Sequence, residues 1–155
     1  MAVGENTVMA DAQSLSSLRG KILRYDTSTV PATAAGYTSG TAVWSLGHRN
    51  PFRFTWRPSN GSMIESENGP NDNDEINKIN QGANYGWPTV SGVGSNPAFV
   101  NPITTFTPTI AITDVMFYTG TSMPALTGTL LYSDFKNNRV RYVTLDAGDQ
   151  ISNDA

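Results

Sequence analysis

Cysteine is absent from the sequence and histidine occurs only once, as His48, so several kinds of chemistry are ruled out or reduced to one residue. Without cysteine the chain can form no disulfide, no thiolate nucleophile and no cysteine-ligated zinc site. Charged residues make up only 15% of the chain, the formal net charge is −3, and the ten lysines and arginines are scattered. We therefore expect neither nucleic acid nor an anionic membrane as a partner.

Long apolar runs are also missing, and none approaches the roughly 18 residues that a membrane-spanning helix needs. Residues 1–6 lack the basic and apolar segments of a signal peptide, so we expect none in this chain. Turn-forming residues, by contrast, are plentiful, with 14 Gly and 9 Pro. Short apolar runs between frequent turn formers favour an all-β protein.

The alternation of apolar and polar residues predicts short strands in three groups. The strands are expected at residues 20–26, 42–46, 52–56, 62–66, 76–79, 110–118, 128–133 and 139–145. Asn60 and Gly61 form the strongest short hairpin signal and would join the third and fourth strands. Residues 11–18 could form one helical turn or a loop.

A faint internal repeat favours a β-propeller over a sandwich or barrel. Residues 21–26 and 139–146 share a pattern of basic, aliphatic and tyrosine residues that ends in Asp, and 76–79 closes the middle group in a similar place. The spacing of roughly 55–65 residues lies near the upper end for propeller blades. The alternative is a chance likeness between amphipathic strands.

The polar run at residues 47–51 holds three candidates for chemistry. His48 could act as a general base, although a lone histidine is more often structural and no nucleophile motif accompanies it. Arg49 offers a planar fork that suits a carboxylate or phosphate, and Asn50 adds an amide. The alternative role for Arg49 is to hold a loop carbonyl.

An oxygen-rich segment at residues 65–75 is a candidate metal site, because carboxylates, amides and backbone carbonyls at short spacing suit Ca²⁺. It lacks the central Gly and the distal Glu of an EF-hand loop. The alternative is a solvated acidic turn. A second loop, at residues 84–88, places Tyr85 and Trp87 beside Gly86, where they could stack on a sugar or planar cofactor, or plug the rim of a propeller or barrel.

Together these segments resemble the glucose/sorbosone dehydrogenase family, whose members include soluble sugar dehydrogenases that use pyrroloquinoline quinone (PQQ). The matching segments, in order, are residues 20–24, 46–51, 67–70, 74–77 and 84–88, with a fainter match at 117–120, 128–131 and 135–136. Complete members are more than twice this length, so the resemblance covers an internal portion of their fold. The family is typically periplasmic or secreted.

The resemblance implies a six-bladed β-propeller of antiparallel sheets, with PQQ and Ca²⁺ near its central axis. This chain would then be a single partial propeller domain, with about three incomplete blades at residues 1–41, 42–102 and 103–155. The family's pattern implies that Arg49 and Asn50 face PQQ and that Lys136 pairs with the cofactor's negative oxygens.

Four further residues acquire a metal-binding role from the resemblance. Gly69 and Pro70 would offer backbone carbonyls to the Ca²⁺ that PQQ also binds. Asp74 and Glu75 would lie near a secondary calcium position. Phe52 departs from the pattern, because sugar dehydrogenases commonly have Gln there.

The resemblance assigns no catalytic residue to this chain. The family's base is a histidine on a segment that precedes the match to Met1, and a basic pair that clamps PQQ follows the point that matches Ala155. We therefore expect a portion of a PQQ- and Ca²⁺-dependent sugar dehydrogenase that is inactive alone.

The alternative function is a non-enzymatic module that self-associates or binds carbohydrate. Incomplete blades leave open sheet edges, and such edges pair with other chains. We expect self-association into a dimer or a larger assembly, and a sugar is a possible ligand.

Overall fold

The computed structural model describes residues 1–154, and nearly all of its regular structure is β-strand. The chain divides into two compact units, which we describe separately. Unit 1 comprises Met1–Pro51 and Ile79–Asn101, and unit 2 comprises Phe52–Lys78 and the described residues from Pro102 onward. Within residues 1–154, neither short helix has the length or apolar character that crossing a membrane requires.

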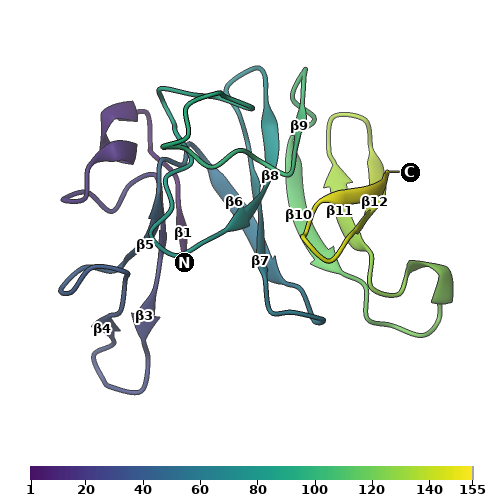
Figure 1. Ribbon diagram of the computed structural model, residues 1–155, viewed down its shortest axis with the longest axis horizontal. Helices are drawn as coiled ribbons and strands as arrows, with labels where there is room; N and C mark the ends of the chain where they lie inside the picture. The colour runs from purple at the N-terminus through teal and green to yellow at the C-terminus, as the bar shows by residue number, and fades with distance from the viewer. Residues whose placement is uncertain (155) are drawn as a thin grey trace. The chain divides into compact units, whose positions relative to one another are not determined.

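Unit 1 contains a three-stranded sheet and a separate two-stranded one (Figure 1). Its elements are β1 (Ala2–Val3), the 3-10 helix η1 (Met9–Gln13), β2 (Lys21–Leu23), β3 (Tyr25–Asp26), β4 (Thr33–Ala34) and β5 (Val43–Leu46). The three-stranded sheet has the order β1-β2-β5, and β3 pairs with β4. The strand expected at residues 20–26 is therefore two short strands in different sheets.

The amino group of Lys21 anchors η1 to the three-stranded sheet. This fully buried side chain donates hydrogen bonds from Nζ to the carbonyls of Asp11, Ala12 and Arg19, at 2.7, 2.9 and 2.7 Å. Burial lowers the Lys21 pKa to about 8, and the charge of Asp11 opposes the shift. Of the helical turn or loop expected at residues 11–18, the structure thus forms a helical turn at the start of this segment, as the end of η1.

Unit 2 contains two four-stranded sheets, the second of which runs from green to yellow in Figure 1. The first consists of β6 (Pro51–Trp56), β7 (Met63–Glu67), β8 (Asp74–Ile79) and β9 (Thr104–Phe106) in that order. The second consists of β10 (Ile112–Phe117), β11 (Leu130–Asp134), β12 (Arg139–Leu145) and β13 (Ile151–Asp154), with the 3-10 helix η2 (Pro124–Leu126) between β10 and β11.

The hairpin predicted at Asn60 and Gly61 is confirmed. Gly61 has a φ of 73°, and the turn is closed by hydrogen bonds from the Arg57 amide to the Ser62 carbonyl and from the Gly61 amide to the Arg57 carbonyl, both 2.8 Å. Glycine adopts this left-handed conformation at no steric cost. The hairpin therefore fixes the register between β6 and β7.

Two strands pair across the boundaries expected between blade pieces. The strand β5 lies beyond the expected boundary at residue 42, yet it pairs with β2 of the first piece. Likewise β9 lies beyond residue 103 and pairs with β8. Each of these two sheets thus includes a strand that lies just after the boundary expected from the sequence. The assignment of these segments to propeller blades stays a prediction.

Both sheets of unit 2 contribute to one hydrophobic core. Ile64 and Ile76 come from the first sheet. The remaining buried members are Ile110, Ile112, Val115, Phe117, Leu130, Tyr132, Val143 and Leu145. Because side chains alternate along a strand, residues 65 and 67 of β7 and residues 75 and 77 of β8 point away from this core.

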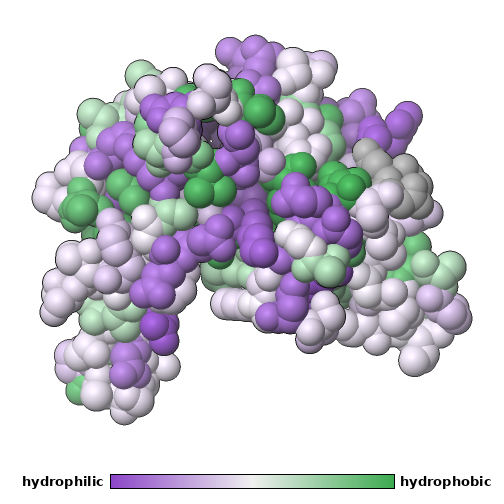
Figure 2. Space-filling model, viewed as in Figure 1, coloured by the Kyte–Doolittle hydropathy of each residue, from purple (hydrophilic) through white to green (hydrophobic). Residues whose placement is uncertain are grey.

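The aromatic residues of β6 do not form a core face. Phe52 and Trp56 are 51% and 59% exposed, and the ring of Phe54 meets that of Trp56 edge to face at 5.2 Å. The alternation at residues 52–56 marks a true strand, but β6 lies at the edge of its sheet. On the face seen in Figure 2, hydrophobic residues form small islands among hydrophilic and neutral ones.

Candidate functional site

Asp74, at the start of β8, organises the loop that was expected to bind calcium. Its Oδ1 accepts a hydrogen bond from the Gly69 amide at 2.8 Å, and its Oδ2 accepts from the amides of Ile110 and Ala111 at 2.8 and 2.6 Å. The side chain is buried, so these charge-assisted bonds anchor the loop firmly. Both carboxylate oxygens are thereby engaged by the backbone.

Gly69 is required by the tight path of this loop. A Cβ atom at this position would lie 2.1 Å from the Asp72 carbonyl oxygen and 2.6 Å from that of Asn73. The Thr109 amide also donates to the Asn71 carbonyl at 3.2 Å. The loop at residues 69–74 is therefore packed directly against residues 109–111.

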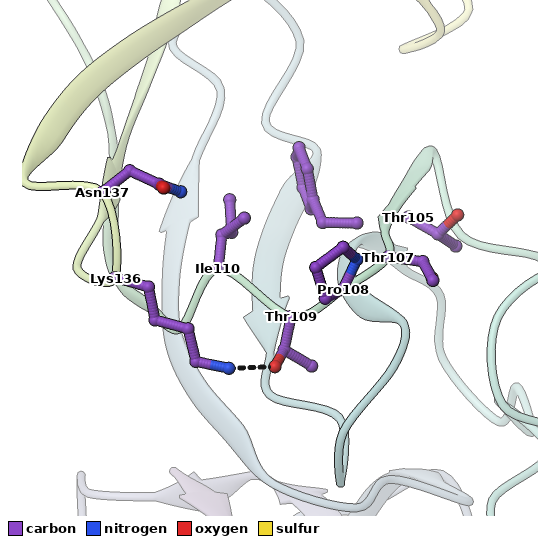
Figure 3. Close-up of a pocket in the computed structure, with 8 residues that line it drawn as sticks. Thr105, Thr107, Pro108, Thr109, Ile110, Lys136 and Asn137 are labelled. Atoms are coloured by element: carbon purple, nitrogen blue, oxygen red, sulfur yellow. Dashed lines mark hydrogen bonds between the residues drawn. The ribbon is translucent and has the colours of Figure 1, made fainter.

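A pocket of about 550 Å³ lies beside this packed loop, within unit 2. It is lined by Thr105, Phe106, Thr107, Pro108, Thr109, Ile110, Lys136 and Asn137. Figure 3 shows Lys136 extending toward Thr109, and Lys136 Nζ donates a short hydrogen bond to Thr109 Oγ1. The Lys136 amide also donates to the Ile110 carbonyl at 3.0 Å.

The cationic group of this pocket is Lys136. Within residues 1–154 no carboxylate forms an ion pair with its ammonium group. The amide of Asn137 is engaged elsewhere, because Nδ2 donates to both oxygens of Asp134 at 2.8 Å. A cation beside a hydroxyl and apolar walls suits an anionic, partly apolar ligand.

The structure places four of the predicted residues at or near this pocket. Gly69, Pro70 and Asp74 belong to the loop that contacts residues 109–111, and Lys136 bonds to the same segment. Thr109 is absent from the residues that the sequence predicts for the site. No sequence motif marks Thr109, and its hydroxyl meets Lys136 only because the fold brings the two residues together.

Glu75 lies apart from Asp74. Alternation along β8 turns the two side chains to opposite faces, and Glu75 Oε2 accepts a hydrogen bond from Asn77 Nδ2 at 3.1 Å. The same amide group donates to Glu65 Oε2 at 3.2 Å. Burial raises the Glu65 pKa well above its usual range, and the charges of Glu67 and Glu75 raise it further.

The other two predicted cofactor residues, Arg49 and Asn50, belong to unit 1. The Arg49 carbonyl accepts a hydrogen bond from the Glu5 amide at 2.8 Å, and its guanidinium lies 5.8 Å from the ring centroid of Trp87. Glu5 is only 6% exposed, and within the described residues its Oε2 has no hydrogen-bond partner. No sequence motif marks Glu5.

The loop at residues 84–88 is locked by Gln13 of η1. Gln13 Nε2 donates to Asn84 Oδ1 at 3.0 Å and to the Trp87 carbonyl at 2.6 Å, and Asn84 Nδ2 donates back to Gln13 Oε1 at 2.7 Å. Gly86 has a φ of 91°. These contacts agree with a structural role for the loop.

His48 is held inside unit 1. It is fully buried, its Nε2 lies 2.8 Å from Ser45 Oγ, and its ring stacks on Tyr85 with 4.7 Å between centroids. A general base needs access to the hydroxyl of a substrate. The geometry therefore favours the structural role over the catalytic one.

Comparison with known proteins shows the family to which this chain belongs. The model of the family "Glucose / Sorbosone dehydrogenase" matches residues 1–155. The chain therefore belongs to the glucose/sorbosone dehydrogenase family, as the sequence motifs predict.

Among individual proteins, the chain is 43% identical over 75 residues to quinoprotein glucose dehydrogenase B of Acinetobacter calcoaceticus, a match that covers 47% of this chain and 16% of that protein. A solved glucose dehydrogenase is similar with a TM-score of 0.87 and 29% identity, over 100% of this chain and 48% of that one. The PQQ-bound aldose sugar dehydrogenase of Streptomyces coelicolor is similar with a TM-score of 0.83 and 26% identity, over 99% and 43%.

These similarities confirm the expected fold class. The chain is all-β with antiparallel sheets and corresponds to part of the six-bladed propeller of these dehydrogenases. It spans between 16% and 39% of the curated relatives compared and about half of the solved structures. The activity of the complete relatives is consequently a matter of proposal for this chain.

Proposed function

We propose that this chain contributes part of the cofactor-binding wall of a PQQ- and Ca²⁺-dependent sugar dehydrogenase. The observation that carries the proposal is the pocket of unit 2, where the Lys136 ammonium and the Thr109 hydroxyl lie beside the packed loop at residues 69–74. Family membership and the quinoprotein relative support it.

The residues of the pocket fit the chemistry of PQQ, a planar quinone that carries carboxylates. The pocket volume of about 550 Å³ lies within the range of small-molecule sites. Lys136 and Thr109 would hold a carboxylate or quinone oxygen, and Phe106, Pro108 and Ile110 offer apolar surface to a ring. When bound, PQQ would supply the acceptor for the hydride of the sugar C–H bond.

The loop at residues 69–74 fits a role in holding Ca²⁺. Its backbone is fixed by the three amides bonded to Asp74, so the carbonyls of Gly69 and Pro70 are held in place before any ion binds. Carbonyl oxygens are ligands that Ca²⁺ accepts readily. In this proposal Asp74 positions the loop, and its own oxygens stay on the backbone amides.

In this proposal the chain binds and orients the cofactor. None of its residues is proposed as the base that removes the proton of the sugar hydroxyl. His48 is buried against Ser45 and Tyr85 and is not proposed as the base. We therefore expect the chain alone to bind PQQ with Ca²⁺ and to give no dye-coupled glucose oxidation. Turnover by the chain alone would contradict this division of roles.

A fluorescence titration with PQQ in the presence of Ca²⁺ tests the cofactor proposal. We expect saturable quenching for the natural chain and binding about tenfold to a hundredfold weaker for Lys136→Met, because a hydrogen bond to a charged group is worth about 1.5–3 kcal/mol. The matched control is Arg139→Gln, which removes an exposed cation outside the pocket. The proposal is overturned by absent binding at tens of micromolar PQQ, or by equal affinity in all three proteins.

A second candidate function is a non-enzymatic module that self-associates or binds carbohydrate. The exposed aromatic residues Phe52 and Trp56 on the edge strand β6 favour it. Exposed aromatic rings can pack against a second copy or stack on a sugar. Sugar binding without any response to PQQ would favour this candidate over the first.

A further inference from the structure

Gly47 joins two segments of unit 1 that lie far apart in the sequence. Its amide donates a hydrogen bond to the Ala12 carbonyl of η1 at 2.9 Å, and its carbonyl accepts one from the Trp87 amide, also at 2.9 Å. A Cβ atom at position 47 would lie 2.2 Å from Asn84 Oδ1, so only glycine allows so close an approach. The polar run that begins at Gly47 is therefore packed between η1 and the loop at residues 84–88.

The side chain of Gln13 fixes the carbonyl of Trp87. Gln13 Nε2 donates to this carbonyl at 2.6 Å. The reciprocal amide bonds between Gln13 and Asn84, 3.0 and 2.7 Å long, hold the Gln13 side chain in this orientation. Because the Trp87 amide is bonded to Gly47, both backbone polar groups of Trp87 are engaged, and one of their two partners is a side chain of η1.

Lys21 in turn holds η1, which is a 3-10 helix of five residues. So short a helix has little stability of its own. The three donors of the Lys21 ammonium group match the three carbonyls that accept from it, and one of these, Ala12, also accepts from the Gly47 amide. The position of Gln13 thus depends on a buried cation in the strand β2.

The indole group of Trp87 has no hydrogen bond of its own to orient it. Its Nε1 atom is buried and lacks a partner within the described residues. Buried N–H donors without a partner are rare and cost free energy. The orientation of the ring is therefore set by its packing and by the backbone bonds of Trp87, which end at Gly47 and Gln13.

Arg49 places its guanidinium group over this ring. Its Cζ atom lies 5.8 Å from the ring centroid of Trp87, within the range of a cation–π interaction. The Arg49 carbonyl accepts a hydrogen bond from the Glu5 amide at 2.8 Å, so its backbone is fixed separately. The donors of a guanidinium form a rigid fork that matches a carboxylate, and the direction of this fork depends on where the ring lies.

We propose that Gln13 is a positioning residue for Arg49. It holds Trp87 where the ring supports the guanidinium group, and Lys21 holds Gln13 in turn. Gln13 lies outside every segment that carries the resemblance to the glucose/sorbosone dehydrogenase family, the first of which begins at residue 20. The role of Arg49 toward a carboxylate of PQQ rests on the proposed function, whereas its support by Gln13 needs no cofactor.

Circular dichroism in the near ultraviolet tests the positioning in the absence of PQQ. The chain has three tryptophans, and the double change Trp44→Phe with Trp56→Phe leaves Trp87 as the sole indole. In this background Arg49→Met gives the signal of a ring without its guanidinium group. We expect Gln13→Leu to change the Trp87 signal in the same direction as Arg49→Met, because the ring then loses the bond that holds it beneath the cation.

Two further variants make this result specific. Gln81→Leu is the matched control, because it makes the same change at an exposed glutamine of unit 1 and should leave the Trp87 signal intact. Gln13→Glu keeps an acceptor for Asn84 Nδ2 and removes the donor to the Trp87 carbonyl, so it should act like Gln13→Leu. An unchanged Trp87 signal in the folded Gln13 variants, even with a lower Tm, would reduce Gln13 to a stabilising role and overturn the proposal.

A titration with PQQ and Ca²⁺ connects the positioning to the proposed function. We expect Gln13→Leu to weaken PQQ binding about twofold to tenfold, as for the loss of a cation–π contact, and to have no further effect when combined with Arg49→Met. Equal losses with and without Arg49 would mean that Gln13 acts independently of it, which overturns the proposal. If the natural chain binds no PQQ, the proposed function fails, and the Trp87 signal still decides whether Gln13 positions Arg49.

Discussion

Arg57 and Asp149 are 92 residues apart in the sequence, and in the fold Arg57 Nη1 lies 2.5 Å from Asp149 Oδ1. Lys78 Nζ lies 2.6 Å from the other carboxylate oxygen, to which Ser62 Oγ also donates at 2.7 Å. Asn60 Nδ2 adds a bond of 3.1 Å. One carboxylate, 1% exposed, thus ties the β6–β7 hairpin and β8 to the turn before β13.

Replacing Asp149 with Asn should be among the more destabilising single changes in unit 2. Removing one partner of a buried ion pair costs about 3–5 kcal/mol, because the remaining charges lose their compensation. Urea unfolding measures the effect. The control is Asp114→Asn, which breaks an exposed pair with Arg53 at 3.1 Å and should cost less than about 1 kcal/mol. Similar losses in both variants would show that the network contributes little.

The same carboxylate should make stability depend on acid pH. Burial acts to raise the Asp149 pKa, but the bonds from Lys78, Ser62, Arg57 and Asn60 outweigh it and hold the pKa well below its usual range. A depressed folded-state pKa adds stability above the unfolded value of roughly 4 and loses it as the pH falls further. Unfolding midpoints of the natural chain should therefore drop more steeply below about pH 5 than those of Asp149→Asn. Parallel curves would contradict the assignment.

Local chemistry made part of this fold predictable. The Asn60-Gly61 turn and the strand at residues 52–56 depend on neighbours in sequence, and both appear as expected. The pairing of β5 with β2 depends on closing a long loop, and no local pattern encodes it. The exposure of Phe52 and Trp56 follows from the edge position of β6, which periodicity alone does not reveal.

The candidate site likewise contains some residues that the sequence could predict and others that it could not. The motif run located the loop that carries Gly69 and Asp74, because its glycine and acidic residues are close together in sequence. Alternation along β8 could have separated Glu75 from Asp74 on sequence grounds alone. The contact of Thr109 with Lys136 could not be found in that way, and neither could the hydrogen bond from Asn77 to Glu65. In each case only the packing of separate segments brings the two residues together.

A methyl group at position 69 should disrupt the proposed calcium loop. In Gly69→Ala the new Cβ would meet two backbone oxygens at 2.1 and 2.6 Å, so the loop must shift. We expect a loss of about 1–3 kcal/mol in the free energy of unfolding, as for other overpacked sites, and weaker binding of PQQ with Ca²⁺. Gly148→Ala is the control, because its Cβ would meet only Asp146 Oδ1, at an ordinary 3.4 Å. Unchanged PQQ binding in Gly69→Ala would remove the loop from the proposed site.

Self-association through the edge of β6 is the last prediction. The strand presents exposed aromatic rings at an edge of its sheet, and exposed edges pair readily with other chains. Light scattering after size exclusion should give the mass of a dimer or larger assembly. Trp56→Arg should shift the mass toward the monomer, since a charged residue on an edge strand opposes pairing. Val30→Arg, which alters a residue 99% exposed outside β6, should leave the assembly intact. A strict monomer at all concentrations would exclude both self-association and the proposed role of this edge.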